Sequence, residues 1–238
     1  MKMDGTMIEV ENLCYKYPDG NEALSGVSFK ITKGEAAAVV GPNGAGKTTL
    51  LLHLNGILAP SAGTVRIGGV KIAKENIPTV RRLVGLVFQN PDDQLFLPTL
   101  SDDVAFGPRN FGQSEEEVKK SVAEALQTVG LEGKGERRPM HLSLGEKKRA
   151  SLATVLACQP PIIVFDEPTA NLDPAGRRQI IQLLNRLKAT LLLTTHDLDL
   201  VRQVCSRVLI LDDGRLHADG ETDKILNDQE LLNLHSLR

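Results

Sequence analysis

Gly41-Pro-Asn-Gly-Ala-Gly-Lys-Thr48 is the stretch of sequence that decides the fold of this chain. It follows the apolar run Ala36–Val40 and precedes a helix predicted over Thr48–Leu54, the strand–loop–helix order of a P-loop. Its glycines allow backbone N–H groups to converge on a phosphate, and the helix adds the positive end of its dipole. We expect Lys47 to reach the β- and γ-phosphates and Thr48 to offer its hydroxyl to Mg²⁺. The residues expected around the phosphates are Gly41, Pro42, Asn43, Gly44, Ala45, Gly46, Lys47, Thr48 and Thr49.

The composition is that of a globular protein with balanced charge. Among 238 residues, 28 are Lys or Arg and 30 are Asp or Glu, which gives a net charge of -2. This balance and an aromatic content of 3% argue against a nucleic-acid partner. The apolar runs are far shorter than the roughly 20 residues that a membrane-spanning helix needs. From the composition we therefore expect a soluble, intracellular, globular domain.

Apolar runs alternate with helix-like segments along the chain, which favours an α/β fold with a parallel sheet. The predicted strands are Ile8–Val10, Val27–Ile31, Ala36–Val40, Thr64–Ile67, Leu83–Phe88, Ile162–Phe165, Leu191–Thr195 and Val208–Leu211. Helices are predicted after Gly46, Gly145, Pro174 and Asp197, and over Glu115–Val129 and Thr222–Leu234. The segment 90–159 has little strand character. We predict one domain, 1–238, with a nucleotide-binding core (1–89 and 160–238) and a helical subdomain (90–159).

Two carboxylates follow the buried strand Ile162–Phe165. Asp166 at the strand end is expected to bind Mg²⁺, directly or through water. Glu167 projects differently and is free to orient or deprotonate an attacking water. Alone, such a pair is more often a solvated strand end, but the P-loop favours the catalytic interpretation. His196 ends the strand Leu191–Thr195 and is either an edge residue or a hydrogen-bonding sensor of the γ-phosphate.

Ser143-Leu-Gly-Glu146 opens a further predicted helix. Its simplest interpretation is a capping box, with Ser143 as N-cap and Glu146 returning to the N–H of Ser143. The same helix start is also a second site suited to an anion, about a hundred residues from the P-loop. Two phosphate-directed helix starts in one chain favour a nucleotide shared between two copies.

Together these segments resemble the ATPase subunits of ABC transporters, over essentially the whole chain. The motifs that carry the resemblance are Gly41–Thr48, Gln89, Leu142–Glu146, Ile162–Glu167, Asn171-Leu-Asp-Pro174 and His196. The resemblance implies an ATPase with a P-loop core, an antiparallel β subdomain and an inserted α-helical subdomain. It also implies that ATP and Mg²⁺ are bound in a head-to-tail homodimer, each ATP lying between one chain's P-loop and the other's signature segment, Leu142–Glu146.

The resemblance assigns roles to further residues. Tyr17 is similar to the aromatic residue that stacks on adenine, although it is equally well a turn residue before Pro18. Gln89 resembles the glutamine that touches Mg²⁺, takes part in catalysis and couples to the membrane partner. Asp173 resembles a residue that reaches across the dimer. Ser143, Gly145 and Glu146 would meet the partner's nucleotide. The family usually has Leu-Ser-Gly-Gly-Gln, so Leu144 and Glu146 are departures from its pattern.

A narrower resemblance comes from Phe88-Gln-Asn-Pro-Asp-Asp-Gln-Leu-Phe96 and Val104-Ala-Phe-Gly-Pro108. Both are similar to segments of the ATPases of energy-coupling-factor importers, which take up cobalt, nickel and vitamins. Leu95, Phe96, Leu97 and Phe106 either fill the core of the helical subdomain or form an apolar patch that docks a partner. The resemblance implies that the Gln89–Phe106 region contacts transmembrane subunits, at the cytoplasmic face of the cell membrane.

The leading prediction is therefore the ATPase of an importer. A soluble ABC protein and a P-loop GTPase or kinase are the alternatives, although the sequence shows neither tandem cassettes nor an Asn-Lys-x-Asp guanine reader. Since every ATPase element lies in one chain, we expect a homodimer. Cobalt or nickel importers use one type of ATPase subunit, so cobalt or nickel uptake is predicted, with a vitamin such as biotin as the alternative.

Overall fold

The computed structural model describes residues 5–237, so the first four residues and Arg238, which the predicted domain includes, lie outside it. The strands are β1 (Thr6–Lys16), β2 (Glu22–Thr32), β3 (Ala36–Val40), β4 (Ala62–Ile67), β5 (Val70–Lys71), β6 (Val84–Val87), β7 (Ile162–Asp166), β8 (Thr190–Thr194), β9 (Arg207–Asp212) and β10 (Arg215–Glu221). The α-helices are α1 (Lys47–Leu54), α2 (Ile77–Leu83), α3 (Leu100–Asn110), α4 (Glu115–Thr128), α5 (Leu144–Leu156), α6 (Pro174–Leu184), α7 (Leu198–Val204), α8 (Thr222–Asn227) and α9 (Gln229–Leu234). Short 3₁₀ helices occupy η1 (Lys74–Asn76), η2 (Pro91–Asp93) and η3 (Pro139–His141).

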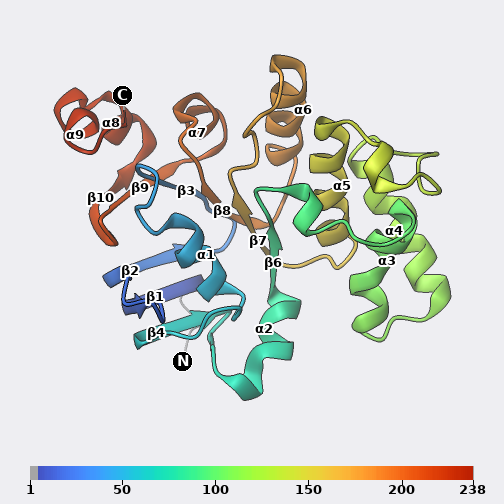
Figure 1. Ribbon diagram of the computed structural model, residues 1–238, viewed down its shortest axis with the longest axis horizontal. Coiled ribbons are helices and arrows are strands. Elements are labelled where there is room, and N and C mark those ends of the chain that lie inside the picture. The colour runs from blue at the N-terminus through green and yellow to red at the C-terminus, as the bar shows by residue number, and fades with distance from the viewer. Residues whose placement is uncertain (1–4, 238) are drawn as a thin grey trace.

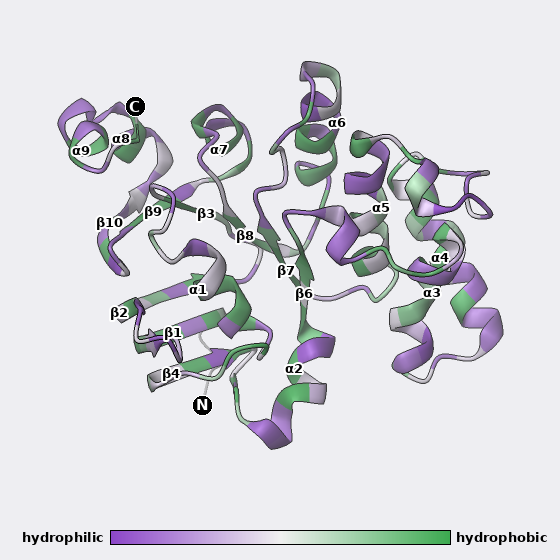
Figure 2. Cartoon of the chain, in the orientation of Figure 1, coloured by the Kyte–Doolittle hydropathy of each residue, from purple (hydrophilic) through white to green (hydrophobic). Residues whose placement is uncertain are grey.

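The six-stranded sheet has the order β10-β9-β3-β8-β7-β6, with β3 between β9 and β8. Its strands run parallel except for β10, which pairs antiparallel with β9. A hydrophobic core lies on each face of this sheet. Ala37 and Val39 of β3 pack into one core, and Ala38 and Val40 pack into the other. Because both faces are covered, β3 is a continuous apolar run, as its sequence predicts. Figure 2 shows the apolar strands β3, β7 and β8 in the middle of the molecule.

A second, antiparallel sheet has the order β2-β1-β4-β5. Helix α1 contacts β2 and β4 of this sheet and also β7 and β8 of the larger one. The P-loop therefore lies where the two sheets and α1 meet, as Figure 1 shows on its left side. The α/β fold class with an antiparallel β subdomain is confirmed.

Helices α3, α4 and α5 pack against one another beside the edge strand β6, on the right of Figure 1. Helix α4 ends one residue before the predicted end, and its stripe Val118, Val122 and Leu126 is buried. Its N-terminus is a capping box in which Ser114 and Glu117 exchange hydrogen bonds. Between β6 and β7 the described chain forms η2, α3, α4, η3 and α5, and α5 contacts the edge strand β6.

Several elements differ from the sequence prediction. Strands β5 and β10 were not predicted, because β5 has two residues and β10 is a half-exposed edge strand without an apolar run. The stretch Thr222–Leu234 forms two helices rather than one, since Asp228 has non-helical backbone angles and caps α9 by accepting a hydrogen bond from the Leu231 N–H. Within residues 5–237, none of the helices combines the length and apolar character that crossing a membrane requires.

Candidate functional site

The P-loop leaves β3 and enters α1 through a backbone that requires glycine. A Cβ on Gly41 would lie 1.9 Å from the carbonyl oxygen of Leu211, and one on Gly46 would lie 2.4 Å from that of Ala23. Gly46 also has a φ of +99°, in the left-handed region. Helix α1 begins at Lys47, one residue earlier than predicted, and its N-cap is Gly46. A residue without a side chain at the N-cap leaves room for a phosphate in front of the first turn.

Lys47 is buried, with 8% of its surface exposed, and its ammonium folds back onto the P-loop. The Nζ atom donates to the carbonyl oxygens of Gly41 at 2.8 Å and Pro42 at 2.9 Å. Burial lowers the pKa of Lys47, and the nearby carboxylates of Glu167 and Asp166 partly offset this effect. The loop therefore holds a cation directed at the space that phosphates would fill.

Asp166 at the end of β7 joins the P-loop helix to the neighbouring strand. Its Oδ2 accepts a hydrogen bond of 2.8 Å from Thr48 Oγ1, and its Oδ1 accepts one of 2.5 Å from Thr194 Oγ1. The carboxylate is 5% exposed. Because β3, β7 and β8 are neighbouring parallel strands, their carboxyl ends bring Thr48 and Asp166 together across 118 residues of sequence.

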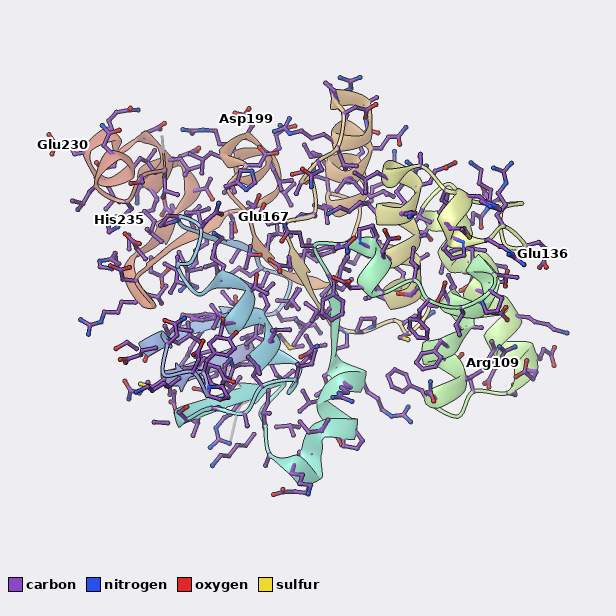
Figure 3. All side chains as sticks on the ribbon, in the orientation of Figure 1. Arg109, Glu136, Glu167, Asp199, Glu230 and His235 are labelled. Carbon is purple, nitrogen blue, oxygen red and sulfur yellow. The ribbon has the colours of Figure 1, made fainter. Side chains whose placement is uncertain are left out.

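Glu167 lies one residue beyond β7 with a left-handed backbone, φ 46°. Its Oε1 is 3.0 Å from Nδ1 of His196, and its Oε2 accepts a hydrogen bond of 3.2 Å from Thr195 Oγ1. Glu167 is 6% exposed, whereas the His196 side chain is 68% exposed. Figure 3 labels Glu167 above the middle of the view, below Asp199 and far from Arg109 and Glu136. The carboxylate is thus held by two groups from the end of β8.

A cavity of about 450 Å³ brings most of the predicted site residues together. The predicted residues that line it are Tyr17, Asn43, Gly44, Gly46, Lys47, Thr48, Thr49, Gln89, Asp166, Glu167 and His196. Gly41, Pro42 and Ala45 belong to the loop but are not among its lining residues. The hydroxyl of Tyr17 lies 3.0 Å from Thr49 Oγ1, and its ring packs edge-on against that of Tyr15, with centroids 4.9 Å apart. We call this hollow the nucleotide cavity.

Ser143, Gly145, Glu146 and Asp173 line a different hollow, of about 650 Å³, which we call the signature cavity. Ser143 is the N-cap of α5 and forms the predicted capping box: its Oγ accepts from the Glu146 N–H at 3.3 Å, and Glu146 Oε2 accepts from the Ser143 N–H at 2.8 Å. Asp173 caps α6 by accepting from the Gly176 N–H at 2.7 Å. One copy of the chain therefore carries two separate sets of predicted phosphate contacts.

Lys134 pairs with the carboxylate of Glu146 at the edge of the signature cavity. The Lys134 hydrogen bond, together with the backbone N–H of Ser143, lowers the pKa of Glu146 to about 2. The side chains of Lys134 and Glu146 are 31% and 19% exposed. The negative charge that departs from the usual signature segment is thus balanced by a cation twelve residues before it.

The structure adds lining residues that the sequence did not single out. Asn21, Ala23, Ala170 and Asn171 line the nucleotide cavity, and Asn171 also lines the signature cavity. Asn171 lies in the Asn-Leu-Asp-Pro motif, which could have pointed to it. The sequence gives no comparable signal for Lys134, because its pairing with Glu146 depends on how the 131–138 loop packs.

The oxygen atoms near Asp166 fit a Mg²⁺ ion bound together with phosphates. Thr48 and Asp166 supply a hydroxyl and a carboxylate, the hard oxygen ligands that Mg²⁺ prefers, and Gln89 lines the same cavity. Across the part of the chain that the structure describes, His, Cys, Asp and Glu form no group of three or more suited to hold a metal ion by themselves. This arrangement matches Mg²⁺, which usually takes one or two protein ligands and completes its shell with phosphates and water.

Comparisons with known proteins agree with this geometry. A family model described as "ABC transporter" matches residues 24–170. The energy-coupling factor transporter ATP-binding protein EcfA of Methanocaldococcus jannaschii is 48% identical over 237 residues, which cover 98% of this chain and 85% of the relative. The solved structure of CbiO1 from Clostridium perfringens, part of the ABC transporter complex CbiONQ, has a TM-score of 0.85 and 37% identity, over 99% of this chain and 96% of that one. The dimeric ATP-binding cassette MJ0796 bound to ADP and phosphate has a TM-score of 0.81 and 31% identity, over 91% and 99%.

Proposed function

This chain belongs to the ABC transporter family, as an ATPase similar to those of energy-coupling-factor transporters, and from that premise we propose that it drives the uptake of cobalt or nickel ions. It works as a homodimer beneath transmembrane subunits, at the cytoplasmic face of the membrane. The observation that carries the catalytic part of the proposal is the convergence of Lys47, Asp166 and Glu167 on one cavity.

Glu167 is the general base of the proposed hydrolysis. Its carboxylate lies in the nucleotide cavity, and contacts from His196 and Thr195 fix its orientation. The carboxylate accepts a proton from the water that attacks the γ-phosphorus in line. His196, exposed at the rim, hydrogen-bonds the γ-phosphate and senses its presence. Gln89, which lines the same cavity, orients the same water.

Lys47 exchanges partners when ATP binds. In the structure its ammonium donates to two main-chain carbonyls of the P-loop. The β- and γ-phosphates are stronger acceptors because they carry charge, so they take over these hydrogen bonds. Lys47 then stabilises the negative charge of the transferring phosphoryl group. Mg²⁺, held by Thr48, Asp166 and Gln89, would supply further charge neutralisation at the phosphates.

The arrangement of the two cavities supports the proposed homodimer. Ser143 and Gly145 line the signature cavity and not the nucleotide cavity, although Asn171 lines both. Two copies related by a two-fold axis bring each nucleotide cavity against the partner's signature cavity. Tyr17 stacks on adenine on one side, and Ser143, Gly145, Glu146 and Asp173 approach from the partner. The similarity to the dimeric MJ0796 cassette supports this arrangement.

An exposed aromatic pair forms the proposed contact with the transmembrane subunits. Phe96 and Phe106 are 63% and 49% exposed, and their rings meet edge to face with centroids 5.5 Å apart. Asp103 fixes the turn between them, since its Oδ1 accepts hydrogen bonds of 3.0 Å from the N–H groups of Phe96 and Leu97. An apolar patch held this firmly suits the apolar side chains of a partner helix. It lies in the Gln89–Phe106 region, so docking and the nucleotide cavity share one segment.

The choice of cobalt or nickel rests on two observations. Every ATPase element is present in this one chain, so two copies build two equivalent sites without a second kind of ATPase. The chain is also similar to CbiO1, part of the ABC transporter complex CbiONQ, and this similarity supports a transporter of that kind. Biotin is the alternative solute, because EcfA-type ATPases belong to the same energy-coupling-factor group.

The test is uptake by cells or vesicles that contain the chain together with its own membrane subunits. We expect ATP-dependent uptake of labelled cobalt or nickel, and no uptake in the Glu167→Gln variant, which should bind ATP but hydrolyse it at least about a hundredfold more slowly. Uptake of biotin alone, or a requirement for a second distinct ATPase chain, would contradict the substrate assignment. Normal turnover by Glu167→Gln would contradict its catalytic role. Replacing Phe96 and Phe106 by Ser should release the chain from the membrane subunits without changing its own ATPase rate.

A further inference from the structure

Lys148 is a buried lysine on α5, two residues after the signature segment. It is 4% exposed, and its ammonium donates to two main-chain carbonyls. One is the carbonyl of Gln89, at 2.6 Å, and the other is that of Glu167, at 3.0 Å. Burial lowers the pKa of Lys148 to about 8, and the carboxylates of Glu167 and Asp166 partly offset this effect. Three segments far apart in the sequence therefore meet at one nitrogen atom.

This arrangement is costly if Lys148 only fills space. An ammonium withdrawn from water loses its hydration free energy. Hydrogen bonds to two neutral carbonyls offset less of this loss than an ion pair with a carboxylate would. A Leu or Met of similar length would fill the same volume without that cost. The carboxylates of Glu167 and Asp166 offset only part of this cost, so we look for the benefit of a lysine in what its two hydrogen bonds hold.

One of the two Lys148 hydrogen bonds holds the backbone of Glu167, the proposed general base. Glu167 has a left-handed φ of 46°, which is rare for a residue with a side chain and is typical of strained functional positions. The Glu167 N–H donates to the carbonyl of Thr194 at 2.9 Å, and its carbonyl accepts from the N–H of Ala170 at 3.2 Å as well as from Lys148. Lys148 thus contributes to keeping this turn, and with it the carboxylate, in one orientation.

The other hydrogen bond holds Gln89, which begins the segment that leads to the Phe96–Phe106 patch. Gln89 follows β6 and lines the nucleotide cavity, and its own carbonyl is bound to Lys148. A movement of this segment that withdraws the Gln89 carbonyl changes how the same ammonium holds Glu167. The link is short, because it has one side chain and two hydrogen bonds.

We propose that Lys148 is a positioning residue that couples the Gln89 segment to the backbone of Glu167. The inference rests on the proposed role of Glu167 as general base. Lys148 itself touches neither the nucleotide nor the attacking water; it acts by fixing the turn from which the carboxylate projects. Its loss should therefore impair the chemical step and leave the binding of ATP intact.

Lys147 offers a matched control on the same helix. Its ammonium pairs with Asp92 at 2.6 Å, so it also ties α5 to the segment after Gln89, but it does not contact Glu167. We compare Lys148→Met with Lys147→Met, using the whole chain, thermal unfolding to check the fold, and steady-state ATPase kinetics. Lys148→Met should lower kcat at least about tenfold, the scale of a misplaced catalytic group, while KM for ATP stays within about twofold. Lys147→Met should change both within about twofold.

Two further variants separate positioning from folding. Lys148→Arg keeps a charge and donors, and should regain part of the kcat that Lys148→Met loses. If Lys148→Met does not fold, Lys148→Gln, which keeps a shorter donor, is judged by the same criteria. The proposal is wrong if a folded Lys148→Met or Lys148→Gln variant has the same kcat as Lys147→Met. It is also wrong if neither Lys148→Met nor Lys148→Gln folds, because Lys148 would then have a structural role. Glu167→Gln is assayed alongside the Lys148 variants. If Glu167→Gln hydrolyses ATP at the normal rate, the proposed role of Glu167 is wrong. If only Glu167→Gln loses activity and the Lys148 variants do not, the inference about Lys148 alone is wrong.

Discussion

Helices α1 and α5 both begin beside a cavity, but the groups at their first turns are arranged in different ways. The N-cap of α1 is Gly46, which has no side chain, and the first helical residue, Lys47, donates to two carbonyls of the loop before it. Helix α5 starts at Ser143, whose hydroxyl and N–H are both engaged with Glu146 in a capping box. One helix start is open to an anion and has a cation beside it. At the other, the Ser143 hydroxyl and the Glu146 carboxylate already take two of the N–H groups.

The difference indicates that the two helix N-termini contribute differently to nucleotide binding. The first turn of α1 has free space and the charge to bind phosphates by itself. The first turn of α5 keeps its geometry without a ligand, and Lys134 cancels the charge of Glu146. A preformed, neutral surface adds little binding of its own, but it closes a site that another copy has already filled. The comparison therefore favours a division of roles in which the first turn of α1 binds the phosphates and the first turn of α5 completes the site on the partner's nucleotide.

The largest expected effect tests whether these roles belong to two different copies. Lys47→Ala and Ser143→Ala should each reduce ATPase activity at least about a hundredfold, the scale of losing a transition-state contact. In a mixed dimer, one composite site carries both changes and the other carries neither. An equal mixture should regain about a quarter of the wild-type rate, because half of the randomly paired dimers have one of two sites intact.

The control is a dimer of wild type with Lys47→Ala, which also has one intact site and shows whether one site turns over alone. Differently tagged chains establish that mixed dimers form. If that control dimer is active and the two-variant mixture stays inactive, the signature segment does not act on the partner's nucleotide, and the division of roles between copies is wrong.

Sequence reasoning found the core of the fold because its strands are apolar on both sides. Runs such as Ala36–Val40 and Ile162–Phe165 need no partner to be recognised as buried strands. It missed β10, whose residues alternate between half-buried and exposed at the edge of the sheet. It also predicted one helix where Asp228 ends α8 and caps α9, because the segment is helix-like on both sides of that residue. Edge strands and helix breaks depend on contacts with residues that are distant in the sequence, which a local sequence pattern does not contain.

The candidate site shows the same limit. The P-loop and the Asp166–Glu167 pair have motifs, so the sequence could name them before the structure brought them to one cavity. Lys134 and Lys148 have none: each is a charged residue on a helical or loop segment, typical of a solvated surface. Their partners, Glu146 in one case and the carbonyls of Gln89 and Glu167 in the other, are fixed by packing alone. Sequence reasoning therefore predicts the groups that react better than the groups that hold them.

A second, smaller effect is expected from uncovering the charge of Glu146. In Lys134→Ala, a carboxylate without its cation faces the phosphates of the partner's nucleotide, so KM for ATP should rise about three- to tenfold. Glu146→Gln in the same chain should restore KM, because it removes the repelling charge. Without Lys134 the pKa of Glu146 returns towards its ordinary value of 4.5, so the carboxylate of the variant is still ionised throughout neutral pH. The effect on KM should therefore be constant there.

The depressed pKa of Glu146 beside Lys134 fixes the sign of the pH dependence of stability. The ion pair stabilises the fold above about pH 4.5 and loses this contribution as the pH falls towards 2. Lys134→Ala should therefore be less stable than wild type at neutral pH, and the difference should shrink in acid. A KM that Glu146→Gln does not restore would show that Lys134 acts on something other than this charge.

The smallest expected effect compares two capping boxes of the same kind. Ser114 and Glu117 begin α4 as Ser143 and Glu146 begin α5, with the same exchange of hydrogen bonds. Ser114→Ala and Ser143→Ala should each lower the free energy of unfolding by about 1 kcal/mol, the usual loss of an N-cap, measured by urea denaturation. Only Ser143→Ala should reduce ATPase activity, because Ser114 lines neither of the two cavities. If Ser114→Ala lowers the ATPase rate as much as Ser143→Ala, then capping stability alone explains the loss, and the first turn of α5 has no separate role at the nucleotide.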